Sequence, residues 1–264
     1  MAPSHPRKTS PPLSSNHLAT LPYDAVLFDM DGVVTRTTSV HAAAWKELFD
    51  SVLADSRSGV GADTPPFDAD RDYRLYVDGR SREDGIRAFL TSRGIQLPTG
   101  SPEDGPDAWS VAGLGARKND LFLTALARDG VDVYPGTVAL LERLRGGGIP
   151  VGLVTASRNA QALLEAAGLE PAFDVIVDGL VAADQGLPGK PDPAMFLEAA
   201  RRLGVSPERS VVIEDAVSGV KAGHAGGFGL VVGIDHAGYR EQLDAAGADV
   251  VLGSVGQLDL GASN

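Results

Sequence analysis

Two aspartates at the end of an apolar segment carry the clearest chemical signal in this chain. Residues 25–28 are apolar throughout and lead directly into Asp29, Met30, Asp31 and Gly32. Such a run predicts a strand covered on both faces, and carboxylates at its end are costly to bury unless a cation or hydrogen bonds compensate them. Gly32 allows the chain to turn here. The simpler alternative is a strand end whose aspartates only cap the next helix.

Further polar side chains lie where later predicted strands end. Thr155 and Ser157 follow one apolar run, Glu214 and Asp215 follow another, and Lys190 precedes a proline at the start of a predicted helix. Because ligands of doubly wound parallel sheets bind beyond the carboxyl ends of the strands, we expect these groups to meet the two aspartates. Taken singly, each has an ordinary explanation, which is helix capping for the hydroxyls and acids and a solvated surface position for the lysine.

Together these groups fit phosphoryl transfer. A carboxylate such as Asp29 can attack phosphorus and form an aspartyl phosphate, which divides a difficult displacement into two steps. Attack on a phosphate dianion requires charge neutralisation, which Mg²⁺ and Lys190 would supply. Asp31 is placed to move the proton of the attacking or leaving oxygen, and Thr155 to donate its hydroxyl to a phosphoryl oxygen. Mg²⁺ prefers oxygen ligands, here a backbone oxygen and the carboxylates of Asp29, Glu214 and Asp215.

The elements that must position these groups alternate along the second half of the chain. Predicted strands lie at 149–154, 174–177, 210–213, 230–234 and 249–252, and predicted helices at 159–167, 193–203 and 216–225. Repeated strand–helix–strand units predict an α/β fold with a doubly wound parallel sheet, that is, a Rossmann-like core. The strand before Asp29 must join this sheet, because its apolar run would not be stable alone.

The stretch between the first strand and the later ones is predicted to be helical. Apolar residues recur at helical spacing in 41–53, 81–92 and 119–128, whereas 94–115 is rich in proline, glycine and aspartate and is predicted to be a long loop. No strand is predicted between 38 and 133. We therefore expect residues 38–134 to form an all-helical cap domain, inserted into a core domain of residues 22–37 and 135–264.

Composition narrows the possible functions. The chain has 264 residues, of which 43% are hydrophobic and none is cysteine. This allows a full core but no disulfide, and it fits a reducing, cytoplasmic location. The net charge of −12 disfavours binding to nucleic acid, and no apolar run predicts a membrane span. We expect a monomer with a disordered tail over residues 1–21, which are rich in proline and serine.

The motifs resemble those of the haloacid dehalogenase-like phosphotransferases. The resemblance rests on four core segments, namely 29–35 (DMDGVVT), Thr155, 190–193 (KPDP) and 214–216 (EDA). It extends to the cap, where 79–84 (GRSRED) is similar to the substrate loop of the β-phosphoglucomutase family and 117–119 (RKN) to a second cap element. The core loop 155–159 (TASRN) matches a segment that contacts both phosphates in that family.

The resemblance implies a role for each matching residue. Asp29 would be the nucleophile, and Asp31 would be the general acid and base. Thr155 and Lys190 would bind the transferring phosphoryl group. The Mg²⁺ ligands would be Asp29, the Asp31 carbonyl, Glu214 and Asp215. The distal phosphate of a glucose bisphosphate would be bound by Arg82, Ser157, Arg158 and Asn159. The remaining substrate contacts would come from His41, Trp45, Gly79, Arg80, Ser81, Lys118 and Ala156.

The resemblance predicts a Mg²⁺-dependent phosphomutase that interconverts β-D-glucose 1-phosphate and D-glucose 6-phosphate through an aspartyl phosphate and glucose 1,6-bisphosphate. Two alternatives stay open. One is a sugar-phosphate phosphatase with the same core, and the other is a non-catalytic sugar-phosphate-binding domain, against which the retention of Asp29, Asp31 and Lys190 argues. Asp78 stands where the family pattern has a lysine, a departure that bears on the sugar more than on the reaction class.

Overall fold

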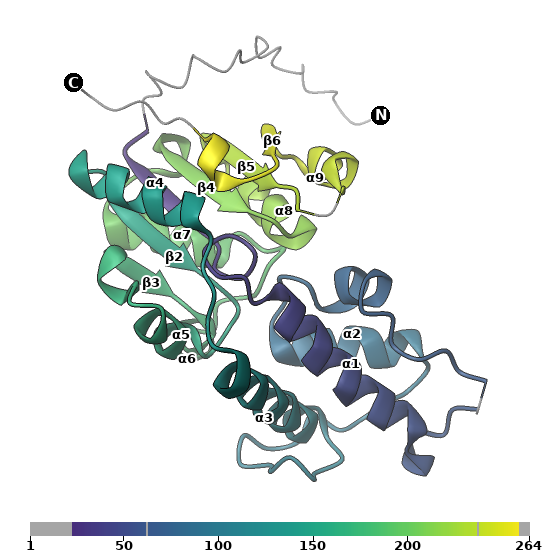
Figure 1. Ribbon diagram of the computed structural model, residues 1–264. Coiled ribbons are helices and arrows are strands. Elements are labelled where there is room, and N and C mark those ends of the chain that lie inside the picture. The colour runs from purple at the N-terminus through teal and green to yellow at the C-terminus, as the bar shows by residue number, and fades with distance from the viewer. Residues whose placement is uncertain (1–22, 62, 237, 259–264) are drawn as a thin grey trace, which may run out of the picture.

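The computed structural model describes residues 23–61, 63–236 and 238–258, so the predicted tail over 1–21 lies outside the described residues. Within these residues the centre is a six-stranded parallel sheet in the order β3-β2-β1-β4-β5-β6 (Figure 1). The strands are β1 Ala25–Phe28, β2 Val151–Val154, β3 Val175–Val177, β4 Ser210–Glu214, β5 Leu230–Ile234 and β6 Val250–Leu252. The predicted doubly wound α/β fold is confirmed.

The first strand lies in the middle of the sheet. Val26 pairs with Val151 on one side and with Val211 on the other. Side chains alternate along β1, so that Val26 and Phe28 face one hydrophobic cluster and Leu27 faces another. Both faces are covered, which explains why the strands read as continuous apolar runs.

Helices cover the two faces of the sheet. On one face α4 (Pro135–Gly146) and α5 (Ala160–Ala166) belong to the hydrophobic cluster that includes Val26 and Phe28, and on the other face lie α7 (Ala194–Leu203), α8 (Val217–Ala225) and α9 (Arg240–Ala246). The short α6 (Gly179–Gln185) follows β3 and has no buried residue. No helix in the described part of the chain combines the length and apolar character that a membrane crossing needs.

Three further helices form a group to one side of the sheet (Figure 1). They are α1 (Thr38–Ala54), α2 (Arg82–Ser92) and α3 (Val111–Asp129), with a π-helical turn, η3 (Tyr73–Val77), between α1 and α2. They share a separate hydrophobic cluster in which the rings of Phe49 and Phe89 are 4.0 Å apart. This packing supports the division into a core of 22–37 and 135–264 and a cap of 38–134, which remains our proposal.

The start of α3 differs from the sequence prediction, which placed a loop over 94–115. The helix begins at Val111, because the Ser110 side chain accepts a hydrogen bond from the Gly113 N–H (3.0 Å) and Val111 is buried in the cap. One of the glycines that suggested a loop, Gly113, serves close packing instead. A Cβ atom on Gly113 would collide with the carbonyl oxygen of Ala108.

The chain leaves the core and returns to it at one place. Thr35 and Val133 form an antiparallel bridge. On either side of it, the Arg36 N–H donates to the Asp132 carbonyl oxygen (2.8 Å) and the Tyr134 N–H donates to the Val34 carbonyl oxygen (3.0 Å). The two linkers of the proposed cap are therefore hydrogen-bonded to each other.

Candidate active site between the cap and the sheet

The turn after β1 brings both aspartates to one cavity. The Gly32 N–H donates to the Thr35 carbonyl oxygen (2.8 Å), which closes the turn. Gly32 has a φ of +87°, and a Cβ atom there would collide with the Asp215 carboxylate. Only glycine fits between the two acidic segments. As a result, Asp29 and Asp31 line the same cavity.

Lys190 is buried against two carboxylates. Its Nζ donates to Asp29 Oδ1 (2.5 Å), to Glu214 Oε1 (2.7 Å) and to the Val154 carbonyl oxygen (3.1 Å). Burial alone would lower the pKa of Lys190, but Asp29 and Glu214 raise it above its ordinary value. The ammonium therefore stays charged, so that it can neutralise an anionic group that approaches Asp29.

Three carboxylates form a candidate metal site. One oxygen from each of Asp29, Glu214 and Asp215 lies within 4.8 Å of the other two. The pKa of Asp29 and that of Asp215 are raised well above the usual range, in the first place by burial and further by neighbouring acidic groups. A divalent cation relieves repulsion of this kind. A donor set of carboxylate oxygens suits Mg²⁺.

Asp31 lies in a different environment from that of Asp29. Its carboxylate accepts a hydrogen bond from the Thr37 hydroxyl and is 3.3 Å from Nε2 of His41. Burial alone would raise the pKa of Asp31, but His41 and Thr37 outweigh this effect and lower it. Two nearby carboxyl groups with pKa values shifted in opposite directions are suited to different chemical roles.

Next to Asp31, His41 and Lys118 form a polar pair inside the cap. Nζ of Lys118 is 2.6 Å from Nδ1 of His41, and it lies 5.0 Å from the ring centroid of Trp45 and 4.6 Å from that of Phe122. Burial is the main reason why the pKa of Lys118 is lowered to about 7. Burial and then Lys118 also lower the pKa of His41. Lys118 therefore titrates near neutral pH.

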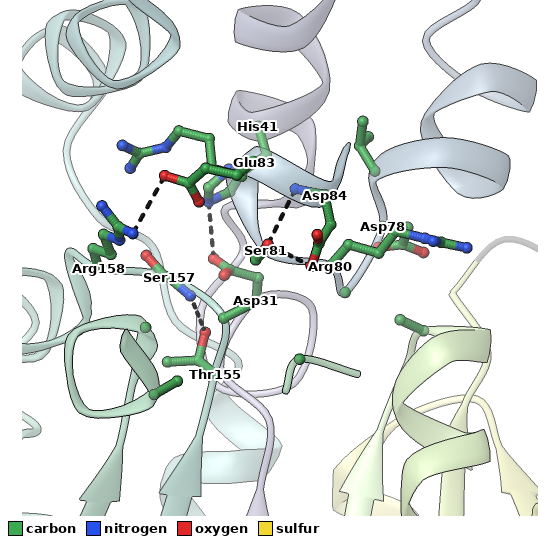
Figure 2. Close-up of a pocket in the computed structure, with 18 of the residues that line it drawn as sticks. Asp31, His41, Asp78, Arg80, Ser81, Glu83, Asp84, Thr155, Ser157 and Arg158 are labelled. Atoms are coloured by element: carbon green, nitrogen blue, oxygen red, sulfur yellow. Dashed lines mark hydrogen bonds and ion pairs between the residues drawn. The ribbon is translucent and has the colours of Figure 1, made fainter. Parts of the chain in front are cut away.

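The cap and the sheet edge enclose a cavity of about 300 Å³. Its lining includes guanidinium groups, of which Arg82 donates to Asn119 Oδ1 (2.9 Å) and Arg158 lies 3.3 Å from Glu83 Oε1. Figure 2 shows Glu83 of the cap and Arg158 of the core reaching toward each other. The cavity lining thus combines carboxylates that follow the sheet strands with guanidinium groups of the cap and the core.

The structure brings most of the predicted site residues to this cavity. Those that line it are Asp29, Asp31, His41, Trp45, Gly79, Arg80, Ser81, Arg82, Lys118, Thr155, Ala156, Ser157, Arg158 and Asp215. Within the described chain, Lys190, Glu214 and Asn159 are not among the lining residues. Lys190 and Glu214 lie behind Asp29, whereas Asn159 donates its side-chain amide to Asn119 Oδ1 (2.9 Å).

Several residues of the site were not predicted. Asp78, Glu83 and Asp84 line the cavity, and Asn119 accepts hydrogen bonds from both Arg82 and Asn159. Burial and then Glu214 raise the pKa of Asp78 to about 7. Two features of the sequence could have indicated these residues. The three acids lie within or directly beside the loop 79–84, and Asn119 follows Lys118.

Comparison with known proteins places this geometry in a class. A sequence model of the haloacid dehalogenase-like hydrolase family matches residues 23–227 of the chain. The matched range includes β1 with its two aspartates, the helices of the proposed cap, Lys190 and the acidic pair at the end of β4. Fold and site together define a haloacid dehalogenase-like protein.

Individual relatives narrow the class further. A protein from Mycobacterium tuberculosis named β-phosphoglucomutase is 45% identical over 89% of this chain and 90% of its own length. Another of that name, from Bacillus subtilis, is 33% identical over 89% of this chain and 92% of its own length. A crystal structure of β-phosphoglucomutase from Clostridium difficile matches with a TM-score of 0.71 and 27% identity, over 90% of this chain and 93% of that one. The chain belongs to the β-phosphoglucomutase family, as its motifs predicted.

Proposed function

We propose that the protein is a phosphomutase that interconverts β-D-glucose 1-phosphate and D-glucose 6-phosphate. The observation that carries this proposal is one cavity that is lined by Asp29 and also by two guanidinium groups. Asp29 pairs with the buried Lys190, and the guanidinium groups are those of Arg82 and Arg158. A sugar bisphosphate can occupy such a cavity in two orientations, as a mutase requires. The names of the relatives support the same reaction.

The proposed chemistry begins at Asp29. Its carboxylate oxygen attacks one phosphorus of glucose 1,6-bisphosphate, so that an oxygen–phosphorus bond to Asp29 forms and the bond from phosphorus to the sugar oxygen breaks. Asp31 donates a proton to that sugar oxygen, and a sugar monophosphate leaves. In the other direction a hydroxyl of the monophosphate attacks the aspartyl phosphate while Asp31 accepts its proton. Loss of the 1-phosphoryl group yields glucose 6-phosphate.

The remaining predicted residues support this cycle. Thr155 and Lys190 would bind the transferring phosphoryl group. Mg²⁺, which neutralises phosphate charge when bound, would be held by Asp29, the Asp31 carbonyl, Glu214 and Asp215. The distal phosphate would be bound by Arg82, Ser157, Arg158 and Asn159. Contact with the sugar and exclusion of water would fall to His41, Trp45, Gly79, Arg80, Ser81, Lys118 and Ala156.

A sugar-phosphate phosphatase is less well supported as the function. Such an enzyme needs only the acidic residues of the cavity and a water molecule. It has no need of the further cationic groups that Arg82 and Arg158 add to the lining. The names of the relatives also favour the mutase.

The experiment that tests the proposal measures both products at once. The protein is incubated with β-D-glucose 1-phosphate, Mg²⁺ and a small amount of glucose 1,6-bisphosphate, and glucose 6-phosphate and inorganic phosphate are followed in parallel. Glucose 6-phosphate should greatly exceed inorganic phosphate. The Asp29→Asn variant should fold, as judged by circular dichroism, and form neither product. Release of inorganic phosphate and free glucose with little glucose 6-phosphate would favour the phosphatase, and a panel of hexose phosphates tests the sugar.

A further inference from the structure

One contact between the proposed cap and the core lies outside the cavity, at Tyr239. This residue directly precedes α9, and Cζ of Arg74 lies 3.7 Å from the centroid of its ring. Its hydroxyl donates to the Asp70 carboxylate, at 3.1 Å from Oδ1 and 3.3 Å from Oδ2. Arg74 and Asp70 form an ion pair with each other. One core side chain therefore contacts both members of a cap ion pair.

Tyr239 is fixed to the sheet through its backbone. Its N–H donates to Asp235 Oδ1 (2.8 Å), and the Asp235 N–H donates to the carbonyl oxygen of Leu252 in β6 (2.8 Å). The Tyr239 carbonyl oxygen accepts from the N–H groups of Gln242 and Leu243 in the first turns of α9 (3.0 and 3.1 Å). These bonds give the tyrosine ring a defined place relative to the sheet edge.

On the cap side, the contact lies at one end of a segment that leads into the cavity. Arg74 belongs to η3, which ends at Val77, and the next residue, Asp78, lines the cavity. The Asp78 carbonyl oxygen accepts a hydrogen bond from the Ser218 hydroxyl of α8 (2.9 Å). Tyr239 and Ser218 therefore hold the two ends of one short cap segment against the core. The position of the loop 79–84, which follows this segment, depends on both contacts.

Two further bonds between cap and core lie beside the guanidinium groups of the cavity. Glu83 pairs with Arg158, and Asn119 pairs with Asn159. A bound sugar phosphate competes for these groups. Tyr239 is not among the cavity-lining residues of the described chain, so its contact with the cap can persist while ligand is bound.

We propose that Tyr239 is a positioning residue that holds the cap over the cavity and thereby decides whether the aspartyl phosphate transfers its phosphoryl group to a sugar or to water. This inference rests on the proposed function. In both outcomes the bond between phosphorus and the Asp29 oxygen breaks, a new phosphorus–oxygen bond forms, and Asp31 takes the proton of the acceptor. A sugar hydroxyl yields a sugar bisphosphate, and water yields inorganic phosphate. A cap that opens more often admits more water.

Two substitutions separate the parts of this contact. Tyr239→Phe removes the hydrogen bonds to Asp70 and keeps the ring beside Arg74, whereas Tyr239→Ala removes both. The readout is the ratio of inorganic phosphate to glucose 6-phosphate, followed by phosphorus NMR. We expect the ratio to rise about fivefold for Tyr239→Phe and about tenfold or more for Tyr239→Ala, from the usual worth of a hydrogen bond and a cation–π contact. Asp70→Ala should raise the ratio by a smaller factor in Tyr239→Phe than in the natural protein, because the bond between the two side chains is already lost in that variant.

The matched control is Tyr23→Phe, which removes another hydroxyl that donates a hydrogen bond, here to the Gly229 carbonyl oxygen (2.9 Å). An unchanged ratio in both Tyr239 variants, or an equal rise in Tyr23→Phe, would overturn the proposal. Small-angle scattering of the ligand-free proteins gives a second readout. The radius of gyration should increase in Tyr239→Ala alone, and an unchanged value would also overturn it. If the natural protein forms no glucose 6-phosphate, the proposed function fails, while scattering still decides whether Tyr239 holds the cap.

Discussion

Asp29 and Asp31 are two residues apart, yet their surroundings shift their proton affinities in opposite directions. Burial and neighbouring acids raise the pKa of Asp29, whereas His41 and Thr37 lower that of Asp31 against the effect of burial. A nucleophilic carboxylate has to be ionised. In the proposed mechanism, positive charge next to Asp29, from Lys190 and from a bound cation, would keep its carboxylate ionised. Activation of the proposed nucleophile would then be coupled to metal binding at a single residue.

The distal phosphate site gives the sharpest prediction at the residue scale. Arg82 lines the cavity far from Asp29 in the proposed arrangement, and its guanidinium is suited to a phosphate. Arg82→Ala should therefore lower mutase turnover by about 10²-fold or more. Slow hydrolysis of a small phosphate ester should continue, because this reaction does not use the distal site. Both rates are measured on the same preparation.

Arg87→Ala is the matched control for this prediction. Arg87 lies on the same helix, is exposed and donates to the Thr99 hydroxyl (3.0 Å), so its loss should leave both rates unchanged. If Arg82→Ala lowers both activities equally, or neither, Arg82 does not bind the distal phosphate.

The lowered pKa of Lys118 predicts how the free energy of unfolding depends on pH. Its pKa of about 7 in the folded protein lies below the 10.5 of an ordinary lysine. Between these values the unfolded chain binds a proton that the folded chain has released, so the free energy of unfolding rises with pH. The free energy of unfolding of the natural protein, minus that of Lys118→Met, should increase by at most ~1.4 kcal/mol per pH unit between about pH 7.5 and about pH 9.5. Urea unfolding in the presence of a chelator measures it, and a difference that is constant with pH would contradict the assignment.

The residues of the sheet edge could be predicted from the sequence, and some residues of the cap could not. Asp29, Thr155 and Glu214 end or follow apolar strands, which is a local signal. Asp78 and Asn119 reach the site only because the cap docks on the core, through bonds such as that from Ser218 to the Asp78 carbonyl. Their only local signals were the position of Asp78 beside the loop 79–84 and that of Asn119 next to Lys118, because docking between distant segments leaves no apolar pattern in the sequence.

At the scale of elements, apolar patterning decided what could be predicted. The six strands and the helices α1, α2, α5, α7 and α8 have such a pattern and were predicted, whereas the helix α4 was not. The short α6, α9 and η3 were not, because few buried positions mark them, and in α6 there is none. At the start of α3 glycine and proline outweighed the capping signal of Ser110. Composition alone does not distinguish a glycine required for close packing from one in a loop.

The packing of α8 on the sheet edge gives a prediction at this scale. Gly219 lies so close to Glu214 that a Cβ atom would overlap its carboxylate. Gly219→Ala should therefore displace Glu214 from Lys190 and lower the free energy of unfolding by about 2 kcal/mol. It should also weaken the dependence of turnover on Mg²⁺. Urea unfolding and a Mg²⁺ titration measure the two effects.

Gly146→Ala provides the comparison, because a Cβ atom at the end of α4 would meet nothing within 4 Å. It should be neutral or slightly stabilising. Equal stability of the Gly219 and Gly146 variants would show that α8 can move away from Glu214 without cost.

At the scale of the whole molecule, the acidic site ties metal binding to stability. Mg²⁺ should stabilise the folded chain because the cluster of Asp29, Glu214 and Asp215 forms only on folding. The gain should be about 2.7 kcal/mol at a Mg²⁺ concentration of about one hundred times its Kd. Thermal unfolding with and without Mg²⁺ measures it, and a chelator should reverse both this gain and turnover. The gain should disappear in Asp215→Asn and persist in Asp107→Asn, which changes an exposed loop residue; an equal gain in both variants would place the metal elsewhere.

The bridge between Thr35 and Val133 has a consequence for how such a protein can diversify. The whole segment between these two residues is inserted in the core like one loop whose ends are hydrogen-bonded to each other. The entropic cost of closing such a loop depends only weakly on its length, so the length and content of the segment have little effect on the stability of the core. An ancestor could have gained, lost or traded a lid here without disturbing the catalytic edge. The same place is open to engineering, where a lid of different shape, joined at these two residues, would redirect one phosphoryl-transfer apparatus to a new set of substrates.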